Sequence, residues 1–104
     1  GTTSAGLTFK ALTPEIRERF EVEEGVDGVM VVDLDRDSDA ATKGVRPGDL
    51  ILTVGPVAVK TPADVVKAVE EASDKGKKVV LLYLYRGGDR RYTAVKIESD
   101  DAED

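Results

Sequence analysis

The sequence contains no cysteine and no histidine. The absence of cysteine excludes disulfides, thiol catalysis and thiolate metal sites. The absence of histidine removes the commonest general base and the commonest metal ligand, so a Ser-His-Asp triad is impossible. There is also no glycine-rich phosphate-binding loop of the G-x-G-x-x-G or Walker type. We therefore expect a chain that is not an enzyme and that uses no cofactor.

Long hydrophobic runs are missing as well. No apolar run approaches the roughly 20 residues that a membrane span needs, and the first residues lack the basic and apolar regions of a signal peptide. Apolar residues make up 40% of the 104 residues, which fits one domain with one modest core. Residues 1–5 are small, polar and unpatterned, and we expect a disordered leader or the remnant of a tag there.

Charge is unevenly distributed. The net charge is -6, but residues 98–104 hold five acids and no Lys or Arg, which leaves 16 acids against 15 bases in the rest. A nearly neutral body with three tyrosines, two phenylalanines and no tryptophan argues against a nucleic-acid partner. We predict an acidic disordered tail over 98–104 and a folded domain over 6–97.

The pattern of apolar residues predicts five or six short strands and three helices. The strongest helix signal is Thr61-Pro62, because Thr61 can cap, Pro62 suits the first helical position and Asp64 completes a capping box. Strands and helices do not alternate regularly, so the fold class is α+β with a largely antiparallel sheet. The expected strands lie at 6–11, 29–34, 49–54, 57–59, 78–86 and 90–97, and shorter helices begin near Pro14 and Asp39.

Four aspartates alternate from Asp33 to Asp39, as they do at the start of a calcium-binding loop. Counted from Asp33, however, the position that requires glycine is Ser38, and the position that requires glutamate is Gly44. The pattern therefore favours a solvated charged loop, and we predict no metal site.

The segment Gly6-Leu7-Thr8-Phe9 places a glycine ahead of a short apolar strand. Glycine lets the backbone turn so that successive N–H groups converge, and such a nest can hold a terminal carboxylate. Taken alone, the tetrapeptide favours an ordinary edge strand, because any edge strand with a glycine looks the same.

A second motif strengthens the interpretation of this tetrapeptide as a carboxylate-binding loop. Residues 44–51 read G-V-R-P-G-D-L-I and look like the G-[LV]-[RK]-x-G-D-x-I signature of PDZ domains. The tetrapeptide resembles the G-L-G-F carboxylate-binding loop of that family, with Thr8 in place of the second glycine. The sequence predicts a type II turn at Arg46-Pro47-Gly48-Asp49, because Pro47 presets φ at the second position and Gly48 allows positive φ at the third. This turn is interpreted as structural, although it is the best family marker.

The order of the segments is similar to that of circularly permuted bacterial PDZ domains, because the loop opens the domain and the strand at 90–97 closes it. The insertion over 12–20 resembles PDZ domains of the HtrA/Deg (Do-type) periplasmic serine proteases. The resemblance implies a partly open antiparallel β-sandwich or barrel with one main helix and two short helices. It also implies an envelope or periplasmic location.

The same resemblance implies a function, namely capture of C-terminal or unfolded extended apolar peptides by β-strand addition, as a substrate-recognition or regulatory domain of such a protease. Pro62 stands where many eukaryotic PDZ helices begin with histidine, so we expect an apolar preference at that ligand position. The side chains of Val31, Ile51, Val65, Ala68 and Leu82 are interpreted as core. The implied carboxylate-binding residues are Gly6, Leu7, Thr8 and Phe9, the strand-pairing residues are Lys10 and Ala11, and the pocket residues are Leu7, Phe9, Pro62, Val66 and Val69.

Two other settings stay open. In one, the domain is chiefly a contact module between neighbouring protease domains in an oligomer, with the groove idle. In the other, it belongs to another envelope protein, such as a site-2 or tail-specific protease or a secretion component. None of these settings involves nucleic acid or direct insertion into a membrane.

Overall fold

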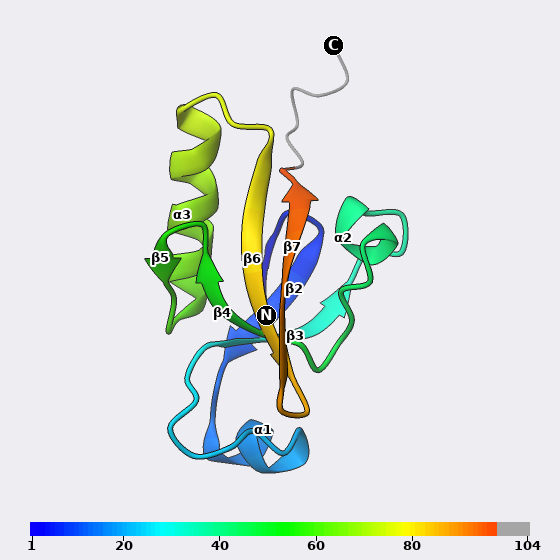
Figure 1. Ribbon diagram of the computed structural model, residues 1–104, viewed down its shortest axis with the longest axis vertical. Coiled ribbons are helices and arrows are strands. Elements are labelled where there is room, and N and C mark those ends of the chain that lie inside the picture. Colours follow the sequence, from blue (N-terminus) through cyan, green and yellow to red (C-terminus); the bar gives the residue numbers. More distant parts are fainter. Residues whose placement is uncertain (98–104) are drawn as a thin grey trace.

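The computed structural model describes residues 1–97, which fold into one antiparallel sheet and three helices (Figure 1). The strand order is β1-β2-β3-β4-β6-β7, and β5 pairs with β4. The α+β, largely antiparallel class predicted from the sequence is confirmed. The strands are β1 (Thr2–Ser4), β2 (Leu7–Ala11), β3 (Val29–Leu34), β4 (Leu50–Val54), β5 (Val57–Ala58), β6 (Val79–Arg86) and β7 (Asp89–Lys96), and the helices are α1 (Pro14–Arg19), α2 (Asp39–Thr42) and α3 (Pro62–Asp74).

The main core lies between α3 and the sheet. The side chains of Val65, Ala68 and Val69 form the buried face of α3 and join buried residues of β2, β3, β4 and β6. The helix begins where the sequence predicted, because Thr61 and Asp64 form the complete capping box. All five side chains interpreted as core, those of Val31, Ile51, Val65, Ala68 and Leu82, are buried.

A second, smaller core lies near α1. The buried side chains of Val22, Met30, Leu50 and Tyr85 form it, and Ile16 of α1 packs against them. Strand β3 contributes to both cores, since Val29 and Val31 join the first and Met30 joins the second. This arrangement explains the unbroken apolar run at the start of β3, because a strand that is covered on both faces needs apolar residues on both.

A buried carboxylate joins the turn before β4 to the β6–β7 hairpin. Asp49 is fully buried, and its oxygens accept hydrogen bonds from the guanidinium groups of Arg86 and Arg91. Its Oδ2 also accepts from the backbone N–H of Arg46 at 2.9 Å. Both arginines donate to the carbonyl oxygen of Gly44, at 3.2 and 3.1 Å. The carboxylate is therefore paired and hydrogen-bonded, as a buried charge must be.

The turn that carries Asp49 has the predicted form. Gly48 has a φ of 101°, a conformation that side chains rarely adopt, and the N–H of Asp49 donates to the carbonyl of Arg46 at 3.0 Å. The N–H of Gly48 donates to the backbone carbonyl of Val31, and the N–H of Val31 donates to the backbone carbonyl of Asp49, each at 2.9 Å. The turn is thereby fixed to β3, which supports its interpretation as a structural element.

The N-terminal segment differs from expectation. The sequence predicted a disordered leader over residues 1–5, but Thr2–Ser4 form β1 and pair with β2. Ala5 and Gly6 have φ values of 53° and 80°, so they make the tight turn that folds the chain back. Gly6 therefore lies in this turn. Because the sequence predicted at most six strands, β1 is the additional strand of the structure. The predicted acidic tail over 98–104 lies outside the described residues.

No helix in the described part of the chain is long and apolar enough to cross a membrane.

Replacing Asp49 with asparagine should destabilise the fold strongly. The substitution keeps the shape but removes the charge that pairs with Arg86 and Arg91, and breaking a buried ion pair on one side costs about 3 kcal/mol. Urea unfolding followed by circular dichroism measures the loss. Asp37→Asn, in an exposed loop, is the control. Equal midpoints for the two variants would contradict the assigned role of Asp49.

Candidate peptide-binding groove

The predicted carboxylate loop leads directly into β2. The side chains of Leu7 and Phe9 are buried in the core that α3 covers, while Lys10 is exposed. Leu7 and Phe9 alternate with Thr8 and Lys10, as side chains do along a strand. The two predicted pocket residues of β2 therefore lie on the face that is covered by α3.

The predicted pocket residues of α3 lie along one stripe of that helix. Pro62, Val66 and Val69 are spaced four and three residues apart, which places them on the same side. Val69 is buried, and Pro62 and Val66 are half-buried. Val66 and Val69 belong to the same packed cluster as Leu7 and Phe9. The structure thus brings together four of the five predicted pocket residues, and Pro62 stands at the start of the same stripe.

Both edges of β2 are paired along the carboxylate loop. On one side Leu7 pairs with Leu34 and Thr8 with Asp33 of β3, and a bulge lies between Thr8 and Phe9. On the other side β1 pairs with residues 7–9. The sequence predicted ligand pairing at Lys10 and Ala11, and the structure places β1 along the preceding residues of the same edge. Lys10 and Ala11 extend beyond the β1 register.

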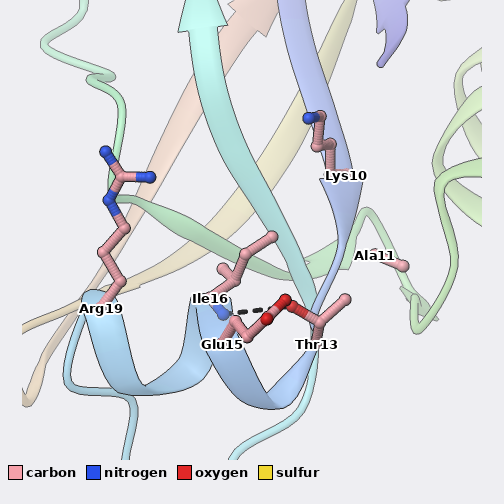
Figure 2. A pocket seen from close by; sticks show the side chains of 6 residues that line it. All are labelled: Lys10, Ala11, Thr13, Glu15, Ile16 and Arg19. Carbon is pink, nitrogen blue, oxygen red and sulfur yellow. Dashed lines mark hydrogen bonds between the residues drawn. The ribbon is translucent and has the colours of Figure 1, made fainter.

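An open recess lies where β2 meets α1, with a volume of about 650 Å³. Figure 2 shows Lys10 of β2 and Arg19 of α1 on either side of Ile16. The hydroxyl of Thr13 caps α1 by accepting from the N–H of Ile16 at 3.1 Å. The sequence did not predict this recess, which forms only when α1 folds against the end of β2.

The alternating aspartates form a local loop and a helix cap. The N–H of Asp37 donates to the side chain of Asp35 at 2.9 Å, and the hydroxyl of Ser38 caps α2 by accepting from Ala41. Asp39 accepts from the backbone N–H of Lys96 at 2.8 Å and from Lys43 Nζ at 3.0 Å. Among residues 1–97, no three acidic side chains are grouped in a way that would hold a metal ion.

Two carboxylates that fix elements of the fold have lowered pKa values. The backbone N–H groups of Lys60 and Thr61 hold the pKa of Asp64 below its ordinary value of 3.8. The N–H of Lys96, together with Lys43, lowers the pKa of Asp39 in the same way. Hydrogen bonds to the charged form favour that form. Asp64 caps the groove helix α3, and Asp39 joins α2 to β7.

The sequence matches the PDZ domain family over residues 6–97. The chain therefore belongs to the PDZ family, and the matched part is a non-catalytic PDZ domain. The match spans both the loop at Gly6 and the last strand, β7.

The curated relatives are larger proteins. The chain is 44% identical over 73 residues to a probable periplasmic serine endoprotease DegP-like of Brucella suis, covering 70% of this chain and 14% of that protein. It is 32% identical over 98 residues to a protein of the same name from Halomonas elongata, covering 90% of this chain and 20% of the relative. The chain thus spans a minor part of the length of these relatives.

Solved structures share the fold. The HtrA3 PDZ domain bound to a phage-derived ligand (FGRWV) superposes with a TM-score of 0.71 at 22% identity, covering 92% of this chain and 86% of that one. The HtrA-type protease AlgW with a decapeptide gives a TM-score of 0.67 at 24% identity, covering 89% and 28%. At these identities the likeness shows the fold alone.

Acid should weaken the fold through Asp39 and Asp64. Because their folded pKa values lie below 3.8, their stabilisation is complete above that pH and is lost as the pH falls through the folded values. We expect the Asp39→Asn/Asp64→Asn double variant to lose less stability than the unmodified chain as the pH falls from 3.8 through the folded pKa values. Urea midpoints measured across this range give the slope of stability against pH, with Glu24→Gln as the control. Parallel slopes for the double variant and the unmodified chain would contradict the prediction.

Proposed function

We propose that this domain captures an extended peptide, which adds as a strand beside β2 in the groove that faces α3. The observation that carries this proposal is that β1 already lies there: it pairs antiparallel with β2 and packs against α3. A three-residue strand of threonine and serine thus fits between the two elements. An apolar peptide of the same backbone geometry can pair with β2 in the same manner.

Backbone groups supply most of the affinity in this mechanism. The N–H groups of Leu7, Thr8 and Phe9 hold the terminal carboxylate, and Lys10 and Ala11 pair with the ligand strand further from its end. The last side chain of the ligand enters an apolar pocket, which selects against a charged side chain at that position. The interface is small, so the affinity is on the order of micromolar, about -8 kcal/mol. The proposed pocket is lined by Leu7, Phe9, Pro62, Val66 and Val69.

The comparisons support this proposal from two sides. The HtrA3 PDZ domain was solved with a five-residue ligand that ends in valine, and AlgW with a decapeptide. The relatives named periplasmic serine endoproteases contain a segment like this one within a much longer chain. In the proposed setting, the domain recognises peptide substrates for a periplasmic Deg-type protease whose catalytic part lies outside residues 6–97.

One observation favours the second setting, a contact module between neighbouring domains. The side chains of Val57, Val79 and Leu81 are exposed beside an open groove of about 560 Å³, which the C-terminal half of α3 and the start of β6 form. None of the residues that line this groove belongs to β2. Light scattering of the isolated domain distinguishes the settings, because self-association that Leu81→Ser abolishes would favour the contact module.

The peptide FGRWV tests the capture mechanism. A fluorescein-labelled peptide should bind as the free acid with micromolar affinity, and about tenfold more weakly as the C-terminal amide, because the amide removes the charge that the loop N–H groups hold. Fluorescence anisotropy gives both constants. Equal affinities for acid and amide would remove the carboxylate from the mechanism.

A charge placed in the groove gives an independent test. Val66→Asp should weaken binding of the acid at least tenfold, because it places an unpaired carboxylate beside the ligand. Lys67→Asn changes the net charge by the same amount on an exposed part of α3 and is the matched control. Thermal unfolding verifies that both variants fold. Normal binding by a folded Val66→Asp variant would place the site elsewhere.

A further inference from the structure

Strand β1 has the direction of a captured peptide. Thr2 pairs with Phe9, Thr3 with Thr8 and Ser4 with Leu7, so the chain runs antiparallel to β2 and towards the loop at Gly6. A peptide whose carboxylate is held by that loop must run the same way. Residues 2–4 therefore lie along the part of the β2 edge where the end of a peptide would pair.

The side chains of β1 also occupy the groove. Residues directly opposite each other on antiparallel strands lie on the same face of the sheet, so Thr2 and Ser4 share the face of Phe9 and Leu7. Helix α3 covers that face and packs against β1. In agreement, Thr2 and Ser4 are half-buried, whereas Thr3 is exposed. Two hydroxyl-bearing side chains thus stand where the proposed pocket would receive an apolar side chain.

The turn between β1 and β2 has a sequence that is unfavourable for its conformation. Ala5 and Gly6 both have positive φ, as the two central residues of a type I′ hairpin turn do. This conformation suits asparagine followed by glycine, whereas alanine adopts it with strain because its Cβ approaches the backbone. The strand is also short and lacks large apolar side chains. It is therefore seated in the groove but held weakly.

We infer that residues 1–5 act as an internal occupant of the peptide groove, which a ligand must displace before it pairs with β2. This inference rests on the proposed function and adds a regulatory step to it. The edge of β2 at residues 7–9 becomes open to a ligand only when β1 leaves. The measured affinity is then the intrinsic affinity reduced by the fraction of molecules in which β1 is displaced.

Two variants should shift this equilibrium in opposite directions. Ala5→Asn gives the turn its preferred sequence, so it should hold β1 more firmly and weaken peptide binding severalfold. Replacing Thr2, Thr3 and Ser4 with glycine weakens the strand without moving the N-terminal charge, so it should tighten binding by about tenfold. Neither variant changes a side chain assigned to the pocket or to the carboxylate loop.

The experiment combines anisotropy titrations of FGRWV free acid with NMR of the unmodified chain. We expect opposite affinity changes in the two variants and, at saturating peptide, loss of the cross-strand NOE between Thr3 and Thr8. Equal affinities in all three proteins, or an NOE that persists in the saturated complex, would overturn the inference while leaving peptide capture intact. If none of the three proteins, the glycine variant included, binds the peptide, both the role of residues 1–5 and peptide capture are overturned.

Discussion

The fold depends most directly on the carboxylate of Asp49, which is buried and held by two arginines. Burying a carboxylate without partners costs free energy, so the turn at 46–49 and the β6–β7 hairpin must meet for either to be stable. The hydrogen bonds between that turn and Val31 extend the constraint to β3. Since β3 pairs with β2 on the side away from β1, the position of β2 in the sheet follows from this one buried charge.

The groove itself needs a second constraint, the start of α3. The capping box of Thr61 and Asp64 fixes where the helix begins, and therefore which residues face β2. Val65 and Ala68 anchor the helix in the core, while Pro62 and Val66 remain half-buried along its edge. One face of α3 is thus used for stability, and an adjacent stripe is left for a ligand.

Features that depend on neighbours in the sequence could be predicted well. The capping box, the positive φ of Gly48 and the alternation along β2 each require a particular residue at a particular place, so the sequence indicates them directly. The two arginines that hold Asp49 come from 37 and 42 residues further along the chain, and nothing local to them signals this role. The recess between Lys10 and Arg19 depends in the same way on how α1 folds against β2.

Strand β1 could not be predicted for a different reason. Its residues are small and polar, and Ala-Gly is not the usual sequence of a type I′ turn, so no propensity favours a hairpin there. The strand forms because the edge of β2 and the face of α3 provide partners for it. The same partners would serve a peptide, which is why the misprediction of residues 1–5 and the proposed function concern one and the same place in the fold.

Capture of a peptide beside β2 is tested most directly by mapping the bound peptide on the domain. Backbone amide shifts of the ¹⁵N-labelled chain, followed during titration with FGRWV free acid, report each residue that the ligand contacts. The largest shifts should occur in residues 1–11 and at Val66 and Val69 of α3, which have a backbone N–H as Pro62 does not. Shifts confined to Val57, Val79, Leu81 and the neighbouring part of β6 would contradict capture beside β2, because the ligand would then occupy the other surface.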